Sequence, residues 1–151
     1  MKAEELMVGD LLIVNKDGLC IKKGSVVRVR GIDADNTFRF GELLGSATCR
    51  PLDNTQFDGG IWCDYLDPIP LTLEILEKNG FEKQGFDGWD YTFGTEADNG
   101  HVLWRTDYGI PHLMIESYSS KYGDFRSFGI QYVHELQHAL KLCGINLEIK
   151  L

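Results

Sequence analysis

The chain has 151 residues, and its net charge is −8, from 15 Lys and Arg against 23 Asp and Glu. At this length it forms one ordinary domain or two small ones, and a hydrophobic content of 43% is typical of a packed globular core. The acidic balance disfavours general attraction to nucleic acid or to an anionic membrane. No apolar run approaches the length of a bilayer-spanning helix, and residues 1–5 lack the pattern of a secretory signal. We therefore expect a cytoplasmic protein without a membrane partner.

The first 67 residues show short β-type segments separated by turns, at residues 11–14, 19–21, 26–30, 37–40, 47–50 and 61–63. Several short strands at regular spacing are typical of a small barrel or sandwich. The apolar opening at residues 6–14, followed by residues 24–29, resembles an SH3-like barrel. We expect a small all-β SH3-like barrel over residues 1–67.

Pro68 and Pro70 mark the expected boundary, because proline cannot donate to a central strand ladder. Thr72 is a candidate N-cap for a helix over residues 73–78, and Asn79-Gly80 supplies its stop.

The rest of the chain alternates between strand-like and helix-like patterns. Strands are expected at residues 89–93, 102–106 and 113–117, a helix at 128–142 and a last strand at 146–151. The fold class is thus α+β, with a second domain over residues 68–151 in the order α-β-β-β-α-β. This order predicts an antiparallel sheet with helices on one face.

The four cysteines form no C-x-x-C pair; they are Cys20, Cys49, Cys63 and Cys143. Free cysteine in the cytosol usually behaves as a small buried hydrophobe, so we expect reduced, structural cysteines. A zinc site built from the first three is the alternative, and their spacing supports it poorly.

Residues 134–138, His-Glu-Leu-Gln-His, match the H-E-x-x-H pattern of zinc peptidases. Residues four apart share one face of a helix, so His134 and His138 are candidate ligands of one zinc ion. Glu135 would then be the general base of a metallohydrolase. The apolar stripe that includes Val133 and Leu136 lies opposite both histidines, which suits a metal cleft and a solvated polar face equally.

A catalytic zinc also needs a third protein ligand. Lys141 and Gly144 stand where one peptidase class has a glycine and a third histidine. Glu148 alternates with apolar residues in the predicted last strand, so we expect it to point away from the helix. The upstream candidates have no signature spacing; they are His101, His112, Glu116 and Asp124.

Two segments, PIPLTLEILEKNGF at residues 68–81 and QYVHELQHAL at 131–140, carry a resemblance to a known group. Together they resemble small uncharacterised proteins of gut Bacteroidales, often encoded near mobile or prophage-like DNA. The resemblance covers roughly residues 66–151. It implies no activity, and because that group has no fixed second histidine, it implies that Glu135 and His138 are variable positions.

Three arginines, Arg28, Arg30 and Arg39, are candidates for one basic face of the barrel. They suggest a nucleic-acid-binding barrel, although the neighbouring acidic residues Asp33 and Glu42 favour an ordinary solvated surface.

The leading hypothesis is a non-enzymatic interaction or adaptor protein of mobile-element or phage origin, with a protein partner and no cofactor. Its support is a folded, acidic, two-part chain without a complete catalytic constellation. The alternatives are a zinc metallohydrolase with zinc at His134 and His138, and a nucleic-acid-binding barrel. The sequence predicts no oligomeric state.

Overall fold

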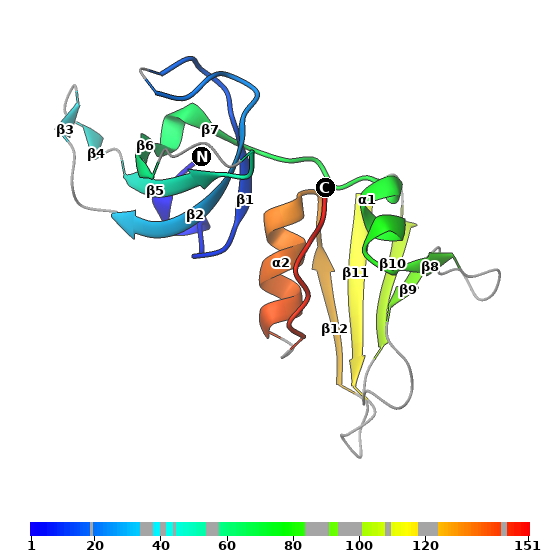
Figure 1. Cartoon of the computed structure of the whole chain (residues 1–151). Helices are drawn as coiled ribbons and strands as arrows, with labels where there is room; N and C mark the ends of the chain where they lie inside the picture. The colour runs from blue at the N-terminus through cyan, green and yellow to red at the C-terminus, as the bar shows by residue number, and fades with distance from the viewer. Residues whose placement is uncertain are drawn as a thin grey trace. The chain divides into compact units, whose positions relative to one another are not determined.

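The computed structural model of the chain divides it into two compact units, Met1–Ile69 and Pro70–Leu151 (Figure 1). The sequence-based boundary lies between residues 67 and 68. The structure describes residues 1–18, 20–33, 38–39, 42–43, 45–53, 58–83, 91–93, 101–107, 110–117, 124–142 and 145–151.

The first unit contains an antiparallel sheet of five strands in the order β6-β5-β2-β1-β7. A separate pair, β3 and β4, lies outside this sheet, and two short 3-10 helices cover Ala3–Glu5 and Cys63–Tyr65. The strands are β1 (Leu11–Val14), β2 (Val26–Asp33), β3 (Phe38–Arg39), β4 (Glu42–Leu43), β5 (Ser46–Pro51), β6 (Gly59–Trp62) and β7 (Leu66–Pro68).

The core of this unit follows from the two-residue period of its strands. In β5, Ala47 and Cys49 are buried while Thr48 and Arg50 are exposed, as expected for a sheet with one face on a core. The buried cluster draws on all five strands and includes Leu12, Val14, Val27, Val29, Ile61 and Leu66.

The expected SH3-like barrel is not closed in the structure. Among the described strands, β6 and β7 end the sheet, and each has one neighbour. The strand expected at residues 19–21 is also not formed at residues 20 and 21. There the chain turns instead, and the Gly18 N–H donates to the Ile21 carbonyl oxygen at 2.8 Å.

The second unit combines two helices with an antiparallel sheet of five strands, which confirms the α+β class. The sheet order is β12-β11-β10-β9-β8. The elements are α1 (Leu73–Lys78), β8 (Glu82–Lys83), β9 (Tyr91–Phe93), β10 (His101–Asp107), β11 (Ile110–Ser117), β12 (Asp124–Gly129) and α2 (Val133–Leu142).

Helix α1 begins and ends where the sequence predicts. The Ile75 N–H donates to Thr72 Oγ1 at 3.3 Å, so Thr72 is the N-cap. Gly80 has a φ of 84°, a left-handed conformation that suits glycine after a helix. The chain then folds back so that Phe81 is buried and its N–H donates to the Leu76 carbonyl oxygen.

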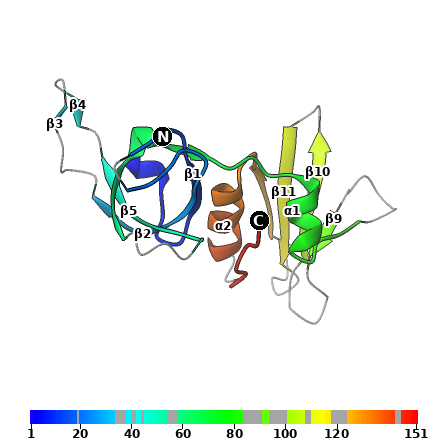
Figure 2. The ribbon, with the colours of Figure 1, turned by 45° about the horizontal axis from the view of Figure 1, so that its top comes forward.

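The order α-β-β-β-α-β is wrong at three places. A short strand that was not predicted, β8, follows α1 directly. Residues 124–129 form strand β12, fully paired with β11, so the second helix begins at Val133 and not at Phe128. Residues 146–151 are not a strand of the sheet. This last segment runs beside α2, as two views show (Figures 1 and 2), and it bonds to the Asn79 side chain near α1.

Neither helix in the described part of the chain has the length and apolar composition needed to cross a membrane.

Candidate binding site

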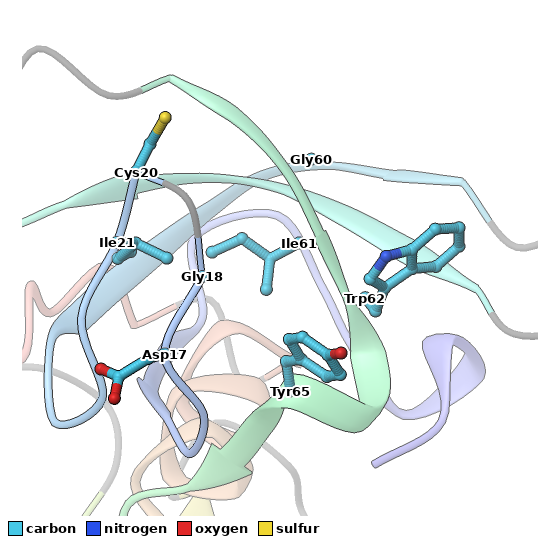
Figure 3. Close-up of a pocket in the computed structure, with 8 residues that line it drawn as sticks. All are labelled: Asp17, Gly18, Cys20, Ile21, Gly60, Ile61, Trp62 and Tyr65. Atoms are coloured by element: carbon cyan, nitrogen blue, oxygen red, sulfur yellow. The ribbon is translucent and has the colours of Figure 1, made fainter.

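An open pocket of about 720 Å³ lies in the first unit, between β6, the 3-10 helix that follows it and the turn after β1 (Figure 3). Ile21 and Ile61 point toward one another across the pocket, with the Tyr65 ring beside them. Its volume falls in the range of sites that hold small ligands or single side chains of a partner. The lining residues are Asp17, Gly18, Cys20, Ile21, Gly60, Ile61, Trp62 and Tyr65.

The turn that forms one wall is held by its own hydrogen bonds. The Lys23 N–H donates to Asp17 Oδ1 at 2.9 Å. Asn15 Nδ2 donates to Asp67 Oδ1 at 2.7 Å and to the Asp64 carbonyl oxygen at 3.2 Å. These contacts tie the turn to the 3-10 helix on the other side, so both walls are positioned in the absence of a partner.

Tyr65 is held at the pocket by contacts from the same turn. The Asn15 N–H donates to the Tyr65 carbonyl oxygen at 2.9 Å, which fixes the backbone. Lys16 Nζ lies 4.5 Å from the centroid of the Tyr65 ring and 3.7 Å from Asp64 Oδ2. Because the Lys16 side chain is 56% exposed, these charge contacts orient the ring more than they stabilise the fold.

The three described cysteines do not behave alike. Cys20 is exposed at the pocket, whereas Cys49 and Cys63 are buried in the core. Burial raises the pKa of Cys49 to about 12, with smaller contributions from Cys63 and Asp58. Burial likewise raises the pKa of Cys63. Burial therefore disfavours the thiolate form of both cysteines. Cys143 lies outside the described residues.

The HELQH segment forms the first turns of α2, and Glu135 is engaged with the backbone there. Glu135 Oε2 accepts hydrogen bonds from the N–H groups of Gln131 at 2.7 Å and Tyr132 at 3.1 Å. This is the reach-back half of a capping box, in which a glutamate in the first turn satisfies backbone donors before the helix. The Glu135 carboxylate thus stabilises the start of α2, a role that was not predicted from the sequence.

The two histidines differ in burial, and His134 is not on a solvated polar face. His134 is only 6% exposed, and its ring stacks on Tyr132 with centroids 5.9 Å apart. The His138 ring meets the His134 ring edge-on at 5.6 Å and is half-buried. The apolar stripe is confirmed, since Val133 and Leu136 are fully buried.

No group of three or more His, Cys, Asp and Glu side chains suited to hold a metal ion occurs within the described residues. Glu148 is exposed, in a segment that is not a strand. Among the upstream candidates, the register places His101 opposite Glu116, and His112 opposite Arg105 and Gly129.

A small cavity of about 160 Å³ adjoins His138 and Glu135. It is too small for a drug-sized ligand. The other described residues of its lining are Gly129, Ile130, Ala139 and Leu142, none of which is ionisable.

Of the three arginines predicted to form a basic face, the structure describes the side chains of Arg28 and Arg30. Arg28 and Arg30 lie at alternate positions of β2, and the register places Arg50 directly opposite Arg28. Sequence reasoning missed Arg50, since only strand pairing brings it there. The side chain of Arg39 lies outside those that the structure describes.

Trp62 and Tyr65, the aromatic residues of the pocket, were also not singled out from the sequence. The available signal was a pair of aromatic residues within five positions after Gly59-Gly60, although such residues also fill ordinary cores.

No protein-family model, curated protein or solved structure matches the chain.

Proposed function

We propose that this protein is a non-enzymatic interaction protein that binds a partner at the pocket of its first unit. The observation that carries the proposal is the open apolar pocket between Ile21, Ile61 and Tyr65. Trp and Tyr are the residues that most often dominate binding energy at interfaces, and both stand at this site.

The surroundings of the pocket support binding in preference to chemistry. Aliphatic and aromatic side chains form most of its walls. Among the described residues of the lining, Asp17 carries the charge. General acid–base or nucleophilic catalysis needs at least two groups within hydrogen-bond reach of a reacting atom. Cys20 and Asp17 alone do not form such a pair with any other described residue of the lining.

The SH3-like description belongs to the same proposal. Five short antiparallel strands and a 3-10 helix between β6 and β7 favour a small barrel-type module. Among the described strands, β6 lies at one end of the sheet, and it lines the pocket.

A random peptide library displayed against the full chain tests the proposal. Selected peptides should bind the wild-type protein and lose about tenfold or more in affinity for Trp62→Ala, the loss typical of an aromatic anchor. Val8→Ala is the matched control, because Val8 is an exposed apolar residue of the same unit outside the pocket. Affinity is measured by fluorescence anisotropy, with circular dichroism to check folding.

Two results would contradict the proposal. One is a set of peptides whose affinity is equal for both variants. The other is stoichiometric zinc in the purified protein that is lost in His134→Ala and His138→Ala, which would favour the metallohydrolase.

A further inference from the structure

We infer that the partner enters as an extended peptide that pairs with the outer edge of β6 and places an apolar side chain in the pocket. This inference rests on the proposed function, because it specifies the occupant of the same site.

Strand β6 is an edge that lacks the usual protection. Among the described strands it pairs with β5 alone. Natural proteins guard such edges with charged side chains, prolines or bulges, yet β6 reads Gly-Gly-Ile-Trp. Two successive glycines in a strand are typical of a place where another backbone approaches closely.

The pairing with β5 shows which backbone groups face outward. Trp62 lies opposite Ser46, and the next residue, Cys63, donates its N–H to the Gly45 carbonyl oxygen at 3.0 Å. In an antiparallel ladder, pairs that exchange hydrogen bonds alternate with pairs that do not. Trp62 and Ser46 therefore do not exchange hydrogen bonds. The N–H and C=O groups of Trp62 point away from β5.

The same alternation applies two residues earlier, at Gly60 opposite Thr48. Gly60 and Trp62 consequently direct their N–H and C=O groups to the outer edge of β6, at the spacing that an added strand requires. A Cβ built on Gly60 meets no atom within 4 Å, so the face of the sheet is open at this residue.

The pocket lies where a side chain of such a strand would point. Gly60, Ile61 and Trp62 form one wall, and Asp17, Gly18, Cys20 and Ile21 lie on the other. A peptide backbone along β6 would direct every second side chain to the same face. An aliphatic or aromatic side chain fits between Ile21 and Ile61, which point toward one another (Figure 3).

The charges near β6 indicate what flanks that side chain. Asp17 lines the pocket, and Asp58 stands immediately before the strand; both are exposed. The nearby cation Lys16 lies 3.7 Å from Asp64 Oδ2, so its charge is matched by a third carboxylate. An acidic side chain on each wall favours a partner segment with Lys or Arg next to its apolar anchor. The occupant is thus an extended segment with a basic residue beside an apolar one.

The test uses peptides selected on the full-length protein and two substitutions at one position. Gly60→Pro removes an outward N–H without removing a bond to β5, and an edge strand tolerates proline there. Gly60→Ala keeps the N–H and meets no neighbour. Peptide affinity should fall about tenfold in Gly60→Pro, because one backbone hydrogen bond to the peptide is lost with its donor. In Gly60→Ala it should stay within about threefold of the wild-type value.

A second measurement leaves the protein unchanged and therefore holds even if Gly60→Pro does not fold. Each backbone nitrogen of a selected peptide is methylated in turn. Strand pairing predicts that affinity for the wild-type protein is lost at every second position only.

The outcomes separate the two proposals. Peptides that need Trp62 but tolerate methylation at every position overturn the strand pairing and leave the pocket as the binding site. Failure to recover any binding peptide overturns both. A concentration-dependent dimer that Gly60→Pro abolishes would also overturn the inference, because the occupant would then be a second copy of this chain.

Discussion

Glu135 illustrates how one side chain acquires a different role once its neighbours are known. It stands between two histidines in a zinc-peptidase pattern, yet its Oε2 accepts from two backbone N–H groups before α2. A carboxylate engaged in this way stabilises the start of the helix, because those donors have no partner within the helix.

Substitutions of Glu135 test this role directly. Glu135→Ala should lower the free energy of unfolding by about 1 kcal/mol, as for the loss of other helix caps. Glu135→Gln retains an oxygen that accepts both bonds, so its stability should stay near that of the wild type. Urea denaturation measures both. Equal stability of all three proteins would show that the contact contributes nothing to folding.

Cys49 gives a prediction about pH. Its pKa is raised from 9.0 to about 12, chiefly because it is buried, so the folded state resists loss of the thiol proton. Above pH 9 the unfolded chain releases this proton and the folded chain does not, so stability falls between pH 9 and pH 12. The slope from one proton is at most about 1.4 kcal/mol per pH unit.

The contribution of Cys49 is isolated by comparison with Cys49→Ala under reducing conditions. The stability advantage of the wild type over this variant should shrink as the pH rises from 8 to 11. Cys20→Ala is the control, because it removes an exposed cysteine and leaves the buried Cys49 in place. A constant difference for Cys49→Ala would contradict the buried thiol.

At the scale of elements, the last segment is attached to the fold by a side chain and not by a strand ladder. Asn79 Nδ2 donates to the carbonyl oxygens of Ile75 and Lys150, each at 2.7 Å, and Asn79 Oδ1 accepts from the Lys150 N–H at 2.8 Å. Lys78 Nζ donates to the Leu151 carbonyl oxygen, and Ile149 is buried. The end of α1 therefore holds residues 145–151.

Asn79→Ala should destabilise the second unit by about 2 kcal/mol, since three hydrogen bonds of a buried side chain are lost. It should also speed proteolysis and hydrogen exchange in residues 145–151. Thr72→Ala is the matched control in the same helix. It removes one exposed capping bond, for a loss of about 1 kcal/mol, without a contact to the last segment. Unchanged protection of residues 145–151 in Asn79→Ala would refute the attachment.

At the scale of the whole molecule, the chain consists of two units with separate buried clusters. The cluster that contains Leu12 draws only on the first unit, whereas Leu136 and Leu140 are buried in the second. A unit with its own core has the means to unfold locally while the other stays folded.

Leu12→Ala should therefore destabilise the first unit by about 3 kcal/mol, as for other large-to-small core substitutions. Hydrogen exchange followed by mass spectrometry should show faster exchange in residues 1–69 and unchanged exchange in 70–151. Leu136→Ala should give the opposite pattern. If either substitution accelerates exchange evenly along the chain, the two units unfold as one.

Local chemistry made several features predictable from the sequence. Thr72 caps α1, Asn79-Gly80 ends it, and the apolar stripe of α2 is buried, because capping and periodicity act over a few residues. The α+β class also followed from these patterns. Strand β12 was not predicted, since its place in the sheet depends on pairing with β11.

The candidate site depended on tertiary structure throughout. Trp62 and Tyr65 become pocket residues only because Gly18 and Ile21 lie opposite them. Arg50 lies opposite Arg28 only because β5 pairs with β2. Sequence alone determined the class, the caps and the helical stripe, which arise from neighbours along the chain. The position of β6 at the end of the described sheet and the attachment of the last segment were decided by contacts between segments far apart in sequence.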